Sequence, residues 1–263
     1  MGTTKTKYEP KWIKVIPLLI FLISWEIIVH FIDYGDFYFA SPSGIAITLY
    51  NQLMSGKLLI DTGVTLIEVL SGFILGNLIG TIIGIIFWYN KNISLIIKPY
   101  LTVLGSIPII AIAPILIIFF GIGMLSKIII VFLSTVVIST IQAYEGATQT
   151  DKQYILYLQS IGSTRLQIFR KIVLPSSLIW LFTGFKLNIG FAILGAFIGE
   201  FISSNQGLGH MIIIAMGLFD TKVIFSGIVV ISIMSFSLNR IIEYFQKKYL
   251  PWQYVESDLK NSR

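Results

Sequence analysis

The chain has 263 residues, no cysteine, and only two histidines, His30 and His210. Without cysteine, the protein can form neither a disulfide bond nor a thiolate metal site nor a thiol nucleophile. The sequence contains no His-Glu-x-x-His pair that could hold a metal, and nothing places its serines and histidines as catalytic partners. A Gly-x-x-x-x-Gly-Lys-Ser/Thr loop for ATP phosphates is absent too. We therefore expect a protein that is not an enzyme, with no catalytic residues, metal site or cofactor of its own.

Charged residues are scarce as well, at 12% of the chain, whereas hydrophobic residues make up 55%. The mean hydropathy is +0.84. A soluble domain of this length would need more polar surface, so the composition indicates an integral membrane protein. The formal net charge of +6 is explained by contact of cytoplasmic loops with anionic membrane lipid, and it requires no nucleic-acid partner.

Six apolar segments have about the length that a bilayer requires. They run over Ile13–Ile32, Val64–Trp88, Pro99–Phe120, Ile128–Ala143, Ser176–Glu200 and Val223–Tyr244. The first lacks a cleavage site of small residues and is expected to be retained. The sequence thus predicts an all-α polytopic membrane protein with six transmembrane helices. A cytoplasmic tail and the first helix fall in residues 1–40, a core with five helices in 41–245, and a cytoplasmic tail in 246–263.

The distribution of basic residues predicts the orientation in the membrane. With a cytoplasmic N-terminus, all but four of the 19 Lys and Arg residues fall on the cytoplasmic side. Lys57, Lys127 and Lys222 then lie outside, and Lys186 lies within a span. Because multi-pass proteins carry such an excess of basic residues in their cytoplasmic loops, we predict that both termini are cytoplasmic.

A polar loop over residues 144–175 separates the fourth and fifth apolar segments. From Asp151 to Ile161, apolar residues recur at helical spacing, which predicts a short amphipathic helix. Gly162 is suited to end that helix, and Thr164 can cap a second one. Pro175 then fits the first turn of a new membrane span. The pattern predicts helix, turn, helix and span, and the alternative is an ordinary basic cytoplasmic loop.

The second apolar segment carries glycines at strict four-residue spacing: Gly72, Gly76, Gly80 and Gly84. A stripe without side chains lets a neighbouring helix approach closely in the membrane. The stripe predicts a packing seam, either within one subunit or between two copies. Asn77 lies beside it and could form a hydrogen bond between helices.

The third segment contains Pro99, Pro108 and Pro114, which remove backbone donors and predict a kink or break within the bilayer. Broken backbone at that depth is tolerated where it is buried or lines a cavity. We therefore expect Ser106, Ile107, Pro108 and Pro114 to shape a translocation pathway. A bent helix that serves only packing is the alternative.

The fifth segment carries polar groups that are costly in hydrocarbon: Lys186, Asn188 and Glu200. They are expected either to belong to the pathway or to form buried pairs. Glu68, in the outer part of the second segment, is the predicted partner of Lys186.

Gly162, followed by nine residues and Ile172-Val173-Leu174-Pro175, resembles the "EAA" loop in the membrane subunits of bacterial ABC importers. Other motifs resemble the branch that carries nitrate, sulfonates, taurine and pyrimidine vitamin precursors. They are Ser41-Pro42-Ser43, Ile107-Pro108 with Ala113-Pro114, Phe120-Gly121-Ile122-Gly123 with Ser126-Lys127, and Gly199-Glu200 with Gly207-Leu208-Gly209.

This resemblance implies a permease subunit in the bacterial inner membrane, working as a homodimer. Two ATP-binding subunits would carry ATP and Mg²⁺, and an extracytoplasmic binding protein would deliver a small solute, anionic or heteroaromatic. The residues that the resemblance assigns to ATPase coupling are Asp151, Tyr154, Leu158, Ser160, Ile161, Gly162, Arg165, Leu174 and Pro175.

The chain also departs from the family pattern. Leu156, Tyr157 and Leu158 stand where Glu-Ala-Ala is expected, so an ion pair from that glutamate is absent. The branch often has arginine where this chain has Glu68 and Lys186. Two other functions compete with ATP-driven import: an ion-gradient-driven secondary transporter, and a membrane scaffold without transport. A secondary transporter is expected to show inverted repeats, which are not evident here.

Overall fold

The structure is a computed structural model that describes residues 15–252. The outermost parts of the two predicted tails, residues 1–14 and 253–263, lie outside the described residues. Between them the chain is helical, and the described residues contain no β-strand. The predicted all-α class is therefore confirmed.

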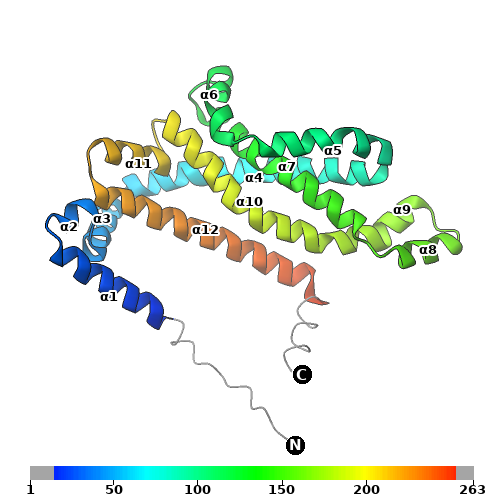
Figure 1. Cartoon of the computed structure of the whole chain (residues 1–263), viewed down its shortest axis with the longest axis horizontal. Coiled ribbons are helices and arrows are strands. Elements are labelled where there is room, and N and C mark those ends of the chain that lie inside the picture. Colours follow the sequence, from blue (N-terminus) through cyan, green and yellow to red (C-terminus); the bar gives the residue numbers. More distant parts are fainter. Residues whose placement is uncertain (1–14, 253–263) are drawn as a thin grey trace, which may run out of the picture. The chain divides into compact units, whose positions relative to one another are not determined.

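Figure 1 follows the helices in chain order. They are α1 (Ile16–Phe31), α2 (Gly35–Tyr38), α3 (Pro42–Met54), α4 (Lys57–Tyr89), α5 (Lys91–Ser106), α6 (Ile109–Phe120), α7 (Met124–Thr148), α8 (Lys152–Ser160), α9 (Arg165–Ile168), the π-helix η2 (Phe169–Val173), α10 (Leu174–Ile202), α11 (Leu208–Gly217) and α12 (Thr221–Tyr249).

Four of the described helices are long and apolar enough to cross a membrane: α4, α7, the continuous helix Arg165–Ile202, and α12. The pair Asn92–Ser106 and Ile109–Phe120 makes a fifth if it counts as one broken span. The first predicted span appears as α1, a helix of 16 residues. Since a span needs about 20 apolar residues, the count of six stays a prediction.

The third predicted span is broken, as its prolines indicate. The helix axes on either side of Ile107 and Pro108 differ in direction by 93°. Pro108 caps the N-terminus of α6 with an extended backbone, where its missing N–H costs no helical hydrogen bond. Pro99 and Pro114 lie inside their helices without ending them.

The described chain forms two compact units, residues 15–59 with 211–229 and residues 60–210 with 230–252. In the first unit, polar side chains fix the start of α3. Ser41 caps the helix by accepting from the Gly44 N–H, and Glu26 of α1 accepts from both the backbone and the hydroxyl group of Ser43. Lys222 lies 2.5 Å from Asp36 and, with Ser41, lowers the pKa of Asp36 to about 2.

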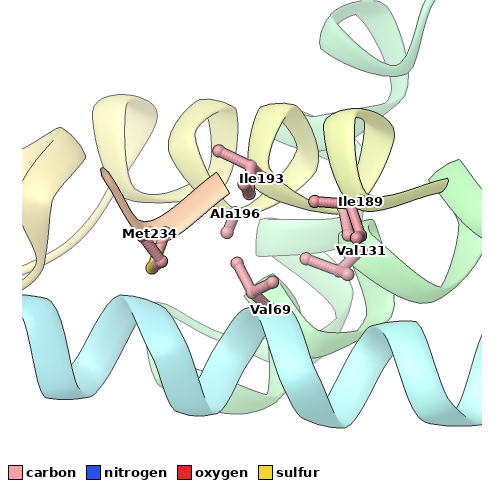
Figure 2. Packing of buried hydrophobic residues seen from close by; sticks show 7 residues of the cluster. Val69, Val131, Ile189, Ile193, Ala196 and Met234 are labelled. Carbon is pink, nitrogen blue, oxygen red and sulfur yellow. The ribbon is translucent and has the colours of Figure 1, made fainter. Parts of the chain in front are cut away.

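The core of the second unit lies where α4, α7, α10 and α12 meet. Figure 2 shows side chains from all four helices pointing toward one another. The labelled residues are Val69, Val131, Ile189, Ile193, Ala196 and Met234. Because lipid is as apolar as these side chains, close van der Waals packing holds such helices together.

Candidate functional site

The loop that follows α7 folds as the predicted helix and turn. Asp151 caps α8 by accepting from the Gln153 N–H at 2.8 Å. Gly162 ends the turn with φ +76°, a left-handed conformation that glycine adopts without strain. Thr164 then begins the next helix with a capping box, in which its hydroxyl accepts from the Gln167 N–H and the Gln167 side chain accepts from the Thr164 N–H.

The predicted boundary between this second helix and a new membrane span is wrong. The chain runs without interruption from Arg165 through η2 and α10 to Ile202, a helix of 38 residues. Pro175 sits in the first turn of α10, but η2 continues directly into it. The end of the loop and α10 therefore form one continuous helix (Figure 1).

Helix α8 has two different faces. Ile155 and Leu158 pack on a buried cluster of Ala147, Ile168 and Val173. Tyr154, Leu156, Tyr157 and Ile161 are all more than 60% exposed. Leu158 thus anchors α8 to its own subunit, whereas we predicted it among the residues that contact an ATPase. Leu156 and Tyr157, in the Glu-Ala-Ala positions, form the exposed apolar face that the prediction missed.

The remaining predicted coupling residues lie at several points along the loop and at the start of α10. The Arg165 guanidinium lies 4.3 Å from the Tyr89 ring centre and 5.8 Å from that of Trp88. These cation–π contacts tie the start of α9 to the end of α4. Asp151, Ser160 and Gly162 are exposed, and Leu174 and Pro175 are half-buried.

The residues predicted to shape the pathway fall into different environments. Ser106, Ile107, Pro108 and Pro114 are exposed around the break between α5 and α6. Lys186 is half-buried near the middle of α10. Asn188 and Glu200 are fully buried inside the subunit, so neither faces an open route there.

Asn188 forms part of a polar cluster between α4, α7 and α10. Its amide nitrogen donates to Asn77 Oδ1 at 2.8 Å and to Ser139 Oγ at 2.7 Å. Ser139 Oγ in turn donates to Asn77 Oδ1 at 2.6 Å. The sequence pointed to Asn77 because it lies beside the glycine stripe, but Ser139 carried no signal of its own.

The glycine stripe on α4 lies against α7. A Cβ atom placed on Gly72, Gly76, Gly80 or Gly84 would overlap backbone or side-chain atoms of α7. At Gly80, for example, it would lie 2.5 Å from the Val136 carbonyl oxygen. In this structure the seam is therefore used within the subunit.

Glu200 holds together the end of α10, the start of α4 and the turn before α11. Its Oε1 accepts from the Thr65 hydroxyl and its Oε2 from the Gly209 N–H, both at 2.6 Å. Gly207 and Gly209 leave room for this carboxyl, since a Cβ on either would overlap it. The motif Gly207-Leu208-Gly209 is thus the binding turn for a buried glutamate.

The predicted ion pair between Lys186 and Glu68 is wrong. Glu68 is in contact with Glu200 and is attracted by Lys127. Lys186 precedes Glu200 by 14 residues, which places it about 21 Å away along the helix axis. Lys127, predicted to lie outside, is 1% exposed and donates to the carbonyl oxygens of Ile122 and Gly123.

Comparison with known proteins identifies the class. Residues 76–251 match the family of binding-protein-dependent transport system inner membrane components. Because this match covers more than half of the chain, the protein belongs to that family. It is a multi-pass permease subunit of an ABC transporter of the importer type.

Its relatives include permeases for several solutes. The chain is 28% identical over 236 residues to the formylaminopyrimidine transport permease protein ThiX of Halalkalibacterium halodurans, covering 89% of this chain and 93% of that one. It is 29% identical over 238 residues to the riboflavin transport system permease protein RibX of Chloroflexus aurantiacus, covering 90% and 89%. The putative aliphatic sulfonates transport permease protein SsuC of Bacillus subtilis is 26% identical over 244 residues, covering 92% and 88%.

Solved structures show the same fold. The match to an inward-facing MetNI methionine ABC transporter covers 73% of this chain and 98% of the matched chain, with a TM-score of 0.61 and 17% sequence identity. An amino acid ABC transporter with histidines matches 78% and 97%, with a TM-score of 0.55 and 17% identity. These findings give no support to the alternative of an ion-gradient-driven secondary transporter.

Proposed function

We propose that two copies of this permease form the translocation pathway of an importer that is driven by two separate ATP-binding subunits. ATP and Mg²⁺ bind to those subunits, and an extracytoplasmic binding protein delivers the solute. Each ATP-binding subunit docks on the exposed face of α8, defined by Tyr154, Leu156, Tyr157 and Ile161.

The observation that carries this proposal is the exposure of four large apolar side chains on one short polar-loop helix. Several exposed large apolar side chains on one short loop helix indicate a protein interface. The other face of α8 is occupied by the cluster around Ala147 and Ile168, so only the exposed face is left for a partner.

The geometry also supports transmission of force into the membrane. Residues 165–202 form one helix from the loop to Glu200. Arg165 ties the beginning of that helix to Trp88 and Tyr89 on α4. When closure of the ATP-binding subunits moves α8, we expect α9, α10 and the end of α4 to move with it as one body.

We infer a small solute that is anionic or heteroaromatic. The named relatives carry formylaminopyrimidine, riboflavin and aliphatic sulfonates. In this chain a hollow of about 600 Å³ lies between α10 and α12, lined partly by Ser235, Phe236 and Asn239. Gly190 also lines it and lies one helical turn after Lys186. Aromatic and hydrogen-bonding groups of this kind suit such a solute.

The docking proposal is tested with Tyr157→Asp in the full chain, co-expressed with its ATP-binding subunit. A charge placed in a desolvated interface stays unpaired, so we expect the ATP-binding subunit to be lost during purification. Solute-stimulated ATP hydrolysis in proteoliposomes should fall with it.

Met54→Asp is the matched control, because Met54 is 69% exposed at the end of α3 and belongs to the predicted outer surface. It should leave both measurements unchanged. Normal recovery of the ATP-binding subunit and normal ATP hydrolysis with Tyr157→Asp would rule out docking on this face.

A further inference from the structure

Three acidic side chains are buried together near one end of the second unit. Asp61 and Glu68 come from α4 and are 4% and 1% exposed, and Glu200 comes from α10 and is 0% exposed. Ionised carboxylates at such positions in a membrane protein are costly unless each has a partner. Glu200 has a donor on each carboxyl oxygen, whereas Asp61 and Glu68 each have one buried oxygen without a donor from the described part of the chain.

Asp61 and Glu200 accept hydrogen bonds from the turn before α11. Asp61 Oδ1 accepts from the Gly207 N–H at 2.9 Å. Both oxygens of Glu200 accept, one from the Thr65 hydroxyl and one from the Gly209 N–H. Each oxygen of Glu200 therefore receives a donor within the subunit.

Glu68 has a different environment. No N–H or O–H group of the described residues donates to its Oε2, which is buried. The carboxyl that lies beside it is that of Glu200. Two ionised carboxylates offer only acceptors and repel each other, so this contact requires a proton.

Lys127 on α7 is the basic side chain near this pair. It attracts both carboxyl groups electrostatically. Its ammonium group, however, donates to the carbonyl oxygens of Ile122 and Gly123. These hydrogen bonds of Lys127 go to neither Glu68 nor Glu200. Within residues 15–252, no group of His, Asp and Glu side chains is arranged to hold a metal ion instead.

We propose that Glu68 donates a shared proton to Glu200, which makes the contact between α4 and α10 a proton-binding site. Removal of the proton puts two negative charges against each other in a buried place, and the contact then opens. The groups that act on the proton are Glu200 from α10, Lys127 from α7 and Asp61 from α4. The turn before α11 contributes backbone N–H groups. This site is independent of the transported solute.

The first test is an infrared difference spectrum of the purified full chain in lipid nanodiscs, recorded on titration from neutral to alkaline pH. A protonated carboxyl gives a C=O stretching band that an ionised one lacks. We expect the wild type to lose such a band as the pH rises. We expect Glu68→Gln to lack it from the start, and Glu145→Gln, which changes a carboxyl paired with Lys98 outside this cluster, to keep it.

A second measurement follows the thermal unfolding midpoint over the same range of pH. The wild-type midpoint should fall toward alkaline pH, because the folded state loses the proton that joins its two helices. Glu68→Gln should reduce this fall, since its amide donates without ionising. Glu145→Gln should leave the fall in place.

Three results would overturn the proposal. The first is the absence of a protonated carboxyl band from the wild-type protein at neutral pH. This measurement does not depend on whether a variant folds. The second is a band that persists in Glu68→Gln. The third is an alkaline fall of the midpoint that disappears when sodium is replaced by choline, which would assign the site to a metal cation.

Discussion

At the scale of single residues, several buried polar groups of this permease bind one another inside the subunit. Asn77, Ser139 and Asn188 form hydrogen bonds with one another across three helices. Glu200 is held by Thr65 and Gly209. In a membrane the alternative to such partners is an unsatisfied polar group in hydrocarbon. These residues therefore specify which faces of α4, α7 and α10 meet.

The asparagine cluster gives a prediction at this scale. Asn188→Leu removes two donors and leaves Asn77 and Ser139 with fewer partners, so the subunit should lose about 1–2 kcal/mol of stability. The double variant Asn77→Leu/Asn188→Leu should lose less than the sum of the two single variants. Unfolding in a denaturing detergent measures both effects.

Asn239→Leu is the control, because the Asn239 amide donates to the Ser235 carbonyl of its own helix. The loss of stability in Asn239→Leu should be smaller than that in Asn188→Leu. Strict additivity of the Asn77 and Asn188 effects would show that the two side chains are not coupled.

At the scale of elements, the molecule combines a close helix seam with a long continuous helix. The glycines of α4 let α7 approach until backbone atoms nearly touch. The helix Arg165–Ile202 carries the loop directly into the membrane. Rigid packing and continuous backbone are what a subunit needs if motion at α8 is to reach the other end of α10.

The seam gives the prediction at this scale. Gly80→Ala places a Cβ against the Val136 carbonyl and should destabilise the subunit by about 1–3 kcal/mol, because neighbouring backbone cannot move aside. Gly63→Ala on the same helix has nothing within 4 Å and should be neutral or stabilising by up to about 1 kcal/mol. Thermal unfolding in detergent compares them, and equal effects would mean that α4 and α7 do not pack as closely as described.

At the scale of the whole molecule, the orientation in the membrane is a prediction from the basic residues. Cysteines introduced one at a time at residues 57, 165 and 205 report it directly, because the natural chain has no cysteine. All three positions are exposed. We expect an impermeant thiol reagent added outside intact cells to label residues 57 and 205.

Residue 165 should react with that reagent only after the membrane is opened. Labelling of residue 165 in intact cells would invert the predicted topology. It would also place the loop that carries α8 outside the cell, where an ATP-binding subunit could not reach it.

Much of the fold follows from local sequence patterns. Some signals act through the local backbone, so they can be recognised without knowing which distant residues are in contact. They are the hydrophobic runs, the prolines around Ile107 and the helix caps at Asp151 and Thr164. The break at Pro108 and the turn at Gly162 were predicted for that reason. The uninterrupted passage from Arg165 into α10 was not, because Pro175 indicated the start of a new helix, whereas the π-helix η2 continues directly into α10.

The sequence by itself determined the class, the helical segments and the position of α8, because composition and periodicity are local properties. Only the tertiary structure decided which buried groups meet. Burial and contact depend on how helices far apart in the chain are packed. Opposite charge led to the prediction that Glu68 pairs with Lys186. The packing of α4 on α10 instead places Glu68 beside Glu200. Leu158 and Tyr157 are adjacent in sequence, but only the cluster at Ala147 and Ile168 determines which of them turns inward.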